Sequence, residues 1–545
     1  MRTILRQLVD RLFTSASGLS VLLMAGALAL ILGPILYRGA TAVVFRGTVE
    51  FRRMQLGEFH RGDADAVEAE VAEAAAARQE MYAVLDAFSE GILIEKLCDR
   101  AREITRQLDA QLQHRLDDGT VTADEARSLH RTARKLRRSL LTAYEATDRA
   151  EALDALAKVT ESPDRGRFQG TAGAELFHQA SRYKEIAEAV DLSRRETYAE
   201  ELQVVSGLVV RLFGPRPQDT AADLAEFRYG ATRWDQAQRI LDELLWKEQW
   251  VAREPGKPLE KVRTPRAAAF KGTPLAEWFP RVGRNLERLL GPRRTFYWQF
   301  FIDDSTAGHF YGGVGPEVLG TLLLTALAMF LAVPVGLITA AYLVECTREN
   351  ILVRILRTCI NTLAGVPSIV FGLFGLAFFV LWLLPAMGLG HGSSVLAGSL
   401  TLAVLVLPII IRASEEAIRA VPVSYKEASL ALGAGGPRTF LTVTLPAALP
   451  GVLTGVILSM SRAAGETAPI LFTAAVAVGP WPGSLLKPCR ALSYASYDIA
   501  VGDRLAARVP HNQFGMILAL VLLVLILNMA AILVRTRISK KLRGG

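Results

Sequence analysis

The sequence has 545 residues, of which 51% are hydrophobic, with a mean hydropathy of +0.26 and a formal net charge of +8. A chain of this composition is too apolar to be wholly soluble and too polar to consist only of membrane spans, so a mixed architecture is predicted. The four cysteines form no C-x-x-C pair, which supports neither a zinc site nor a redox motif, and we expect no metal or cofactor in this chain. A disulfide between Cys98 and Cys489 stays open.

Six apolar stretches are long enough to cross a bilayer as helices. A hydrocarbon core about 30 Å thick needs roughly 20 residues, since each helical residue rises about 1.5 Å. The first stretch could be a signal peptide, but its length and the lack of a clear A-x-A site favour a retained helix at residues 18–37, after a cytoplasmic N-terminus at 1–17. The other five lie within residues 314–535, at about 318–344, 360–384, 395–411, 449–476 and 514–534.

Lysine and arginine predict the side of the membrane on which each loop lies. Basic residues fall at alternate ends of successive spans, which places both termini in the cytoplasm, with a basic tail at 536–545. The last outer loop departs from this rule, because it carries Lys487, Arg490, Arg504 and Arg508. The residues that fix the orientation are Arg2, Arg6, Arg11, Arg348, Arg354, Arg357, Arg412, Arg419, Lys426, Arg438, Arg535, Arg537, Lys540, Lys541 and Arg543.

Residues 38–313, between the first two spans, are expected to form a soluble domain outside the cytoplasmic membrane. Apolar residues recur at three- and four-residue steps over 63–159, and further helical patterns cover 172–212 and 233–250, so long amphipathic helices are predicted, with a turn at 117–120. The prolines and glycine of 253–274 predict a linker. No catalytic set emerges, and we interpret the scattered histidines as solvated or capping side chains: His60, His114, His130 and His178.

The most specific pattern lies between the fourth and fifth spans. Residues 427–433 read E-A-S-L-A-L-G, and V-T-L-P follows nine residues later at 443–446. We expect 427–432 to form a short amphipathic helix at the cytoplasmic face, with Gly433 ending it in a left-handed conformation and Pro446 opening the next span. The pattern resembles the E-A-A-x3-G-x9-I-x-L-P signature of ABC importer permeases, with Ser and Val as substitutions.

Two further segments resemble the PstA permease family of phosphate transport systems. They read N-T-L-A-G-V-P-S-I-V-F-G-L-F at 361–374 and S-R-A-A-G-E-T-A-P-I-L-F-T at 461–473. The resemblance runs from about residue 315 to the C-terminus and does not cover the insertion. It implies an all-α integral membrane protein of the type I ABC importer permease architecture, with six transmembrane helices, in a bacterial inner membrane. The domain between the first two helices is then mainly helical and extracytoplasmic.

The same resemblance implies the partners. They are a homologous sister permease, two cytoplasmic ATPase subunits and a periplasmic phosphate-binding protein, in membrane lipid and without nucleic acid. ATP and Mg²⁺ would be bound by the ATPase, because this chain has no G-x-x-x-x-G-K-[ST] loop and is not expected to be an enzyme. The loop expected to couple to the ATPase contains Glu427, Ala428, Ser429, Gly433, Leu445 and Pro446.

Charged residues inside the spans are candidates for the substrate path. Arg462 and Glu466 are four residues apart in the expected fifth span, hence on one helical face, where an unpaired charge would cost several kcal/mol. Arginine suits tetrahedral oxyanions, and the resemblance supports a transport role, with Arg412 at the end of the fourth span lining the inner part of the path. The alternatives are a structural salt bridge and, for Arg412, a side chain that reaches the membrane interface.

Three further points stay open. The cargo could be another oxyanion, such as sulfate, molybdate or phosphonate, because the coupling loop is shared among such importers. A membrane sensor is disfavoured, because only residues 535–545 follow the last span. The insertion is hypothesised to dock the binding protein or to brace the sister subunit.

Several prolines are expected to interrupt spans: Pro334, Pro367, Pro408 and Pro469.

Overall fold

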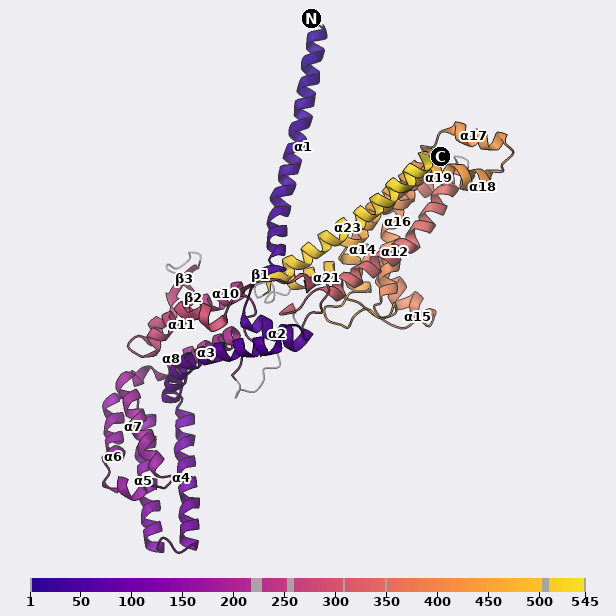
Figure 1. Cartoon of the computed structure of the whole chain (residues 1–545). Helices are drawn as coiled ribbons and strands as arrows, with labels where there is room; N and C mark the ends of the chain where they lie inside the picture. Colours follow the sequence, from indigo (N-terminus) through magenta and orange to yellow (C-terminus); the bar gives the residue numbers. More distant parts are fainter. Residues whose placement is uncertain are drawn as a thin grey trace. The chain divides into compact units, whose positions relative to one another are not determined.

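The chain forms two compact units, and both are mainly helical (Figure 1). The computed structural model describes residues 2–216, 228–251, 259–306, 309–347, 350–501 and 509–543. The insertion unit is Arg46–Arg294, and the membrane unit joins Met1–Phe45 to Thr295–Gly545. The chain passes between them through β1 (Val44–Gly47) and β4 (Arg293–Phe296), which pair with each other. The side of the membrane on which the insertion unit lies stays a prediction.

The insertion unit consists of helices joined by short turns. The turn expected at 117–120 is confirmed, with Gly119 at φ 71° between α4 and α5. Side-chain caps fix the starts of α3, α5 and α6, because Asp63, Thr122 and Asp148 accept hydrogen bonds from backbone amides of the first turn. The helices are α2 (Val49–Phe59), α3 (Ala64–Ile92), α4 (Ile94–Asp117), α5 (Ala123–Glu145), α6 (Arg149–Thr160), η1 (Pro163–Phe168), α7 (Ala174–Ala189), η2 (Leu192–Arg194), α8 (Arg195–Phe213), α10 (Trp234–Leu245), η3 (Arg266–Phe270) and α11 (Leu275–Leu290).

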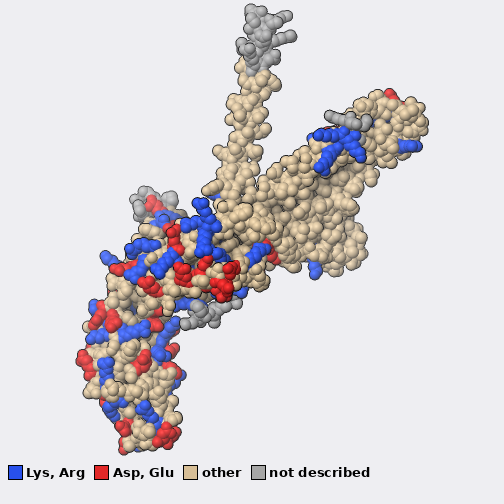
Figure 2. Space-filling view, in the orientation of Figure 1, with Lys and Arg blue, Asp and Glu red and all other residues tan. Residues whose placement is uncertain are grey.

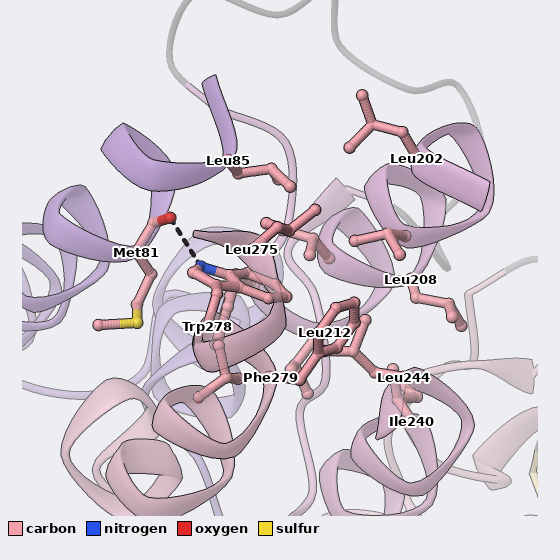
Figure 3. Packing of buried hydrophobic residues seen from close by; sticks show 14 of the residues in the cluster. Met81, Leu85, Leu202, Leu208, Leu212, Ile240, Leu244, Leu275, Trp278 and Phe279 are labelled. Carbon is pink, nitrogen blue, oxygen red and sulfur yellow. Dashed lines mark hydrogen bonds between the residues drawn. The ribbon is translucent and has the colours of Figure 1, made fainter. Parts of the chain in front are cut away.

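Two hydrophobic clusters hold the insertion unit together. The first joins α3, α8, α10 and α11 around Trp278, which is 2% exposed and whose Nε1 donates to the backbone oxygen of Met81 at 2.9 Å (Figure 3). The second joins α4, α5, α6 and α7 around Tyr144 and Tyr183, whose ring centroids lie 4.7 Å apart, edge to face. Both clusters are made of residues within 46–294, so the unit has a core of its own.

The linker expected at 253–274 is wrong over the part that the structure describes. Strand β3 (Glu260–Pro265) pairs antiparallel with β2 (Trp246–Val251), and the 3-10 helix η3 follows it directly. Pro255, Gly256 and Pro258 lie outside the described residues. The segment is ordered because β3 completes a hairpin and Phe270, at the end of η3, is fully buried in the first cluster. The sequence predicted neither the hairpin nor the buried Phe270, because the prolines indicated a linker.

The membrane unit is built from long apolar helices connected by short ones. Three π-helical turns, at η6 (Tyr342–Cys346), η7 (Leu376–Leu383) and η8 (Phe440–Thr444), continue α12, α14 and α18. A 3-10 helix, η4 (Trp298–Phe301), precedes α12. The α-helices are α1 (Arg2–Ala40), α12 (Gly315–Ala341), α13 (Ile351–Leu363), α14 (Ser368–Gly375), α15 (Leu384–Ala386), α16 (Val395–Arg419), α17 (Val423–Ala431), α18 (Gly436–Thr439), α19 (Leu445–Gly465), α20 (Ala468–Thr473), α21 (Leu492–Val501) and α23 (Pro510–Arg543).

Six stretches among the described residues are long and apolar enough to cross a membrane, which confirms the number expected from the sequence. The third begins at Ser368 rather than near 360, because α13 ends at Leu363 and Pro367 disfavours helix in the residue before it. The stretches are Leu12–Ala40, Gly315–Cys346, Ser368–Ala386, Val395–Arg419, Gly436–Gly465 and Pro510–Lys541.

Helix α16 lies at the centre of the bundle and contacts α12, α14, α19 and α20. It approaches α19 closely, since a Cβ added to Gly455 would lie 2.3 Å from the Cβ of Ala413. The C-terminal end of helix α1 contacts α23, where Gly39 meets Leu518. Charged residues crowd the visible face of the insertion unit, whereas most of the visible face of the membrane unit carries none (Figure 2). The lipid-facing character of the bundle is therefore evident from its surface.

Candidate functional site: charged residues of the bundle and its exposed loop helix

Arg462 and Glu466 are brought together at a break between two helices. Helix α19 ends at Gly465, Glu466 has an extended backbone (φ −76°, ψ 129°), and α20 begins at Ala468. The Nε of Arg462 donates to Oε1 of Glu466 at 3.2 Å, and the two side chains are 41% and 18% exposed. The expectation of a single helix over 449–476 with both charges on one face is therefore wrong, although the pair itself forms.

The break has a local cause. Gly465 weakens the last turn of α19, and Pro469 occupies the first turn of α20, where its missing N–H costs nothing. Ser493 at the start of α21 donates its hydroxyl to the backbone oxygen of Glu466 at 3.2 Å. The guanidinium of Arg462 is therefore partly exposed and paired with one carboxylate. In this geometry an oxyanion can replace the carboxylate as the partner of the guanidinium.

Residues 427–433 form the expected loop helix and its cap. Helix α17 (Val423–Ala431) contains Glu427, Ala428 and Ser429, and Gly433 follows it with φ 86°, as predicted. No residue of α17 is buried, although the helix contacts α18 and η8, and its neighbour Leu432 is 90% exposed. A helix without buried residues that exposes apolar side chains is typical of a surface that a partner covers.

Two contacts tie α17 to the rest of the membrane unit. The Oγ of Ser429 lies 3.0 Å from Oγ1 of Thr439 on α18, and Lys426 forms an ion pair with Glu345 of η6. The loop helix is thus linked to the ends of two membrane helices, α12 through its π-helical turn and α19 through α18 and η8. A displacement of α17 would reach the bundle through these contacts.

Pro446 does not open the fifth span. The helical run begins at Gly436 and continues through η8 into α19, so Leu445 and Pro446 lie inside it. The π turn η8 ends at Thr444, two residues before the proline, and the sequence pattern alone did not reveal it. The prediction that Pro446 begins the span is wrong for this reason.

Arg412 does not end the fourth span, because α16 continues for two more turns to Arg419. Its side chain is 55% exposed, and its Nη2 lies 3.9 Å from Glu416, too far for a hydrogen bond. The neighbouring Glu415 forms ion pairs with Arg357 at 2.9 Å and with Arg419 at 2.8 Å. In the sequence, Arg357 and Arg419 indicated only the orientation of the chain, and the role of Glu415 was not predicted, although its four-residue spacing to Arg419 could have indicated the pair.

A buried charged network occupies the opposite end of the bundle. Arg490, 5% exposed, pairs with Asp304 and lies 3.4 Å from Glu317, which is fully buried in the first turn of α12. Its Nη1 also donates to Ser305 at 3.0 Å. This explains why Arg490 departs from the charge rule in the last outer loop: its charge is neutralised inside the protein. Burial, with Arg490 nearby, lowers the pKa of His309 to about 4.

The cysteines and histidines form no further site among the residues that the structure describes. All four cysteines are free, and burial raises the pKa of Cys489 to about 12 and also raises that of Cys98. His60 ends α2 in a left-handed conformation, as a capping residue does. Within the described ranges, no group of three or more His, Cys, Asp or Glu side chains could hold a metal ion.

These features define a class: a multi-pass helical membrane protein with a charged pair at a helix break and an exposed loop helix at one end of its bundle. Residues 332–544 match the family of the binding-protein-dependent transport system inner membrane component. Over 256 residues the chain is 33% identical to the probable ABC transporter permease protein YqgI of Bacillus subtilis, covering 45% of this chain and 85% of that protein. The chain therefore belongs to this family of transport permeases.

Other relatives carry more specific names. The phosphate transport system permease protein PstA 1 of Mycobacterium tuberculosis is 36% identical over 254 residues, covering 46% of this chain and 78% of its own. PstA of Yersinia pestis is 34% identical over 237 residues, covering 44% and 75%. These matches confirm the resemblance read from 361–374 and 461–473. An inward-facing structure of the MetNI methionine ABC transporter aligns with a TM-score of 0.32 and 21% identity, covering 41% of this chain and 94% of that one.

Proposed function

We propose that this chain is the permease subunit of an ATP-driven importer of inorganic phosphate. One observation carries the proposal: the family match at 332–544 includes both the Arg462–Glu466 pair and α17, and relatives matched over three quarters of their length are named phosphate transport permeases. In this reading the membrane unit forms the path, and the chain has no catalytic residue of its own. ATP and Mg²⁺ belong to a separate ATPase.

The path uses Arg462 as a transient anion partner. A phosphate that reaches the helix break can replace Glu466 as the acceptor for the Arg462 guanidinium, because both present oxygens to the same rigid set of donors. When phosphate leaves, Glu466 takes its place again at 3.2 Å, so the arginine charge is never left without a partner in the membrane. Arg412 serves the inner part of the same path.

Helix α17 is the element on which the ATPase acts. Its exposed apolar residues would be covered by the partner, and its contacts through Lys426 and Ser429 carry the movement to α12 and α19. Nucleotide-driven closure of the ATPase pair would then bias the bundle between outward-open and inward-open states. The residues assigned to this coupling are Glu427, Ala428, Ser429, Gly433, Leu445 and Pro446.

The assembly follows from this role. The chain would lie in a bacterial inner membrane with both termini in the cytoplasm, paired with a homologous sister permease and supplied by a periplasmic phosphate-binding protein. The insertion unit, which has its own core, would dock that binding protein or brace the sister subunit.

Uptake of radiolabelled phosphate tests the proposal in cells where this gene encodes the only high-affinity permease of its type. We expect deletion to abolish uptake, Arg462→Gln to reduce it severely, and Arg354→Gln, an exposed arginine on α13, to leave it unchanged. Unaltered phosphate uptake after deletion would overturn the proposal. Loss of sulfate uptake with normal phosphate uptake would assign another oxyanion to the same path.

A further inference from the structure

The β2–β3 hairpin of the insertion unit exposes large apolar side chains (Figure 1). Trp250 is 65% exposed, Val251 40%, and Leu259, directly before β3, 57%. The register pairs Trp250 with Lys261 and Val251 with Glu260, so the three apolar residues stand together at one end of the hairpin. This is the end opposite to the one that α10 joins. We call Trp250, Val251 and Leu259 the hairpin patch.

Two tryptophans lie on one face of the hairpin, among basic side chains. Trp246 and Trp250 are both in β2 and an even number of residues apart, so they point to the same side. The guanidinium of Arg263 on β3 lies over the Trp246 ring, 5.2 Å from its centroid. Lys261 pairs with Glu248, between the two tryptophans, at 2.5 Å. Tryptophan beside lysine and arginine is typical of protein surfaces that meet the headgroups of a bilayer.

The end of the hairpin next to α10 is fixed to the neighbouring helices. Lys247, on the face opposite to the tryptophans, forms an ion pair with Glu201 of α8. Arg263 pairs with Asp242 of α10 at 2.5 Å. These basic side chains have carboxylate partners within the chain. The hairpin patch is therefore the part of the hairpin that a partner can cover, and the contact it offers is apolar.

The hairpin is held near the membrane by its place in the chain. The candidate span Leu12–Ala40 is followed almost directly by β1, whose last residue, Gly47, bridges to Arg233 just before α10. Helix α10 has 12 residues and β2 has 6, which are lengths of about 18 Å and 20 Å. Trp250 therefore lies within about 40 Å of Gly47. Such a tether raises the effective concentration of a surface near its partner, so even a weak contact forms.

We propose that the hairpin patch inserts into the headgroup region of the bilayer, in the leaflet on its own side, and holds the insertion unit to the membrane. A lipid surface fits the patch better than a protein, because a standard protein interface takes roughly 20–30 residues a side. An indole ring combines an apolar body with one N–H donor, which suits the boundary between headgroups and acyl chains. The inference goes beyond the proposed function, because it depends on the spans and not on the cargo.

Quenching by nitroxide lipids tests the contact with the full chain in nanodiscs. The four native cysteines are serines, and Leu259→Cys carries an environment-sensitive fluorophore. The nanodiscs consist of phosphatidylcholine, part of which has a nitroxide on the acyl chain close to the headgroup. We expect the emission of this label to shift to shorter wavelength and to be quenched by the nitroxide lipid. The same label on Glu125→Cys, at an exposed position of α5, should show neither effect.

A variant of the patch itself sharpens the test. In the chain labelled at position 259, Trp250→Gln should lower the quenching to the level seen at position 125, because the largest apolar side chain of the patch is lost. Gln249→Ala is the matched control, since Gln249 is exposed and points to the opposite face of the same strand, and it should leave the quenching unchanged. The quenching should also persist at high salt, because the contact is apolar.

The inference is overturned if the label at position 259 is quenched no more than the label at 125, or if Trp250→Gln leaves the quenching unchanged. A shift in emission without quenching also overturns it, because the patch would then be covered by protein. Loss of the quenching at high salt would replace apolar insertion by electrostatic attachment and would equally overturn it. Each of these outcomes leaves the proposed transport of phosphate untouched, and a failure of phosphate uptake leaves the lipid contact untouched.

Discussion

Removing Arg490 should destabilise the membrane unit far more than removing Glu317. Arg490→Met leaves the fully buried carboxylate of Glu317 without its cation, and breaking a buried pair in this way costs roughly 3–5 kcal/mol. Glu317→Gln leaves Arg490 paired with Asp304 and Ser305 and removes only a contact of 3.4 Å. That loss should be about 1 kcal/mol. The double variant should recover much of the Arg490→Met loss, with a coupling energy of about 1 kcal/mol or more.

Alkylation of Cys489 provides a local assay for this comparison. The thiol is 1% exposed next to Arg490, and its pKa is raised to about 12, so it should react only when this end of the bundle opens. The background chain would carry serine at Cys98, Cys346 and Cys359. Alkylation midpoints on heating then rank the variants without assuming that both units unfold together. Equal losses for the two single variants, or additive losses in the double variant, would refute the compensation argument.

Three other predictions follow from single residues. Trp278→Ala should destabilise the insertion unit by roughly 3–5 kcal/mol in thermal unfolding of the full chain, because a buried ring and its hydrogen bond to Met81 are lost; a loss under 1 kcal/mol would contradict the packing. Gly433→Ala should strain the left-handed cap by about 1–2 kcal/mol without any clash, so ATP-driven uptake should fall and the free energy of unfolding should fall by no more than this strain; unchanged uptake would show that the cap does not matter. The pKa of His309 is about 4 in the folded chain against 6.5 in the reference state, so the unfolded chain binds the proton more tightly. The free energy of unfolding therefore falls as the pH drops below 6.5, by about 1.3 kcal/mol between pH 7.5 and 5.5. His309→Asn, which tolerates the positive φ, should remove that loss in a pH series of unfolding temperatures, and an unchanged pH dependence would contradict it.

The sequence predicted those features that depend on residues close together in the chain. Long apolar runs define spans by length alone, so all six were found. The loop helix with Gly433 at φ 86° and the turn at Gly119 were also predictable, because glycine favours these backbone conformations locally. The Arg462–Glu466 pair was expected on one face of a continuous helix, which is wrong. A separation of four residues still allowed the two groups to meet across the helix break.

The features that the sequence did not predict depend on distant partners. Glu317 and Arg490 are separated by most of the membrane unit along the chain, and only folding shows that they neutralise each other. The hairpin formed by β2 and β3 was not predicted, because the prolines of this segment indicated a linker. The order of the hairpin depends on pairing between its strands, which no local pattern indicates. Pro446 was expected to begin a helix because nothing in its sequence neighbourhood indicates the π turn before it.

Site-directed crosslinking from α17 tests the central claim most directly, that a separate ATPase moves this membrane unit through its loop helix. A single cysteine replaces Glu427 in one chain, and in a control chain it replaces His391, which is exposed in the loop before α16 at the opposite end of the bundle. The native cysteines are serines in both chains. We predict that a short crosslinker captures an ATP-hydrolysing subunit from position 427, in a manner that changes with nucleotide, and captures none from position 391. Capture of an ATPase from 391, or labelling of 427 only by reagents applied outside the cell, would contradict the account.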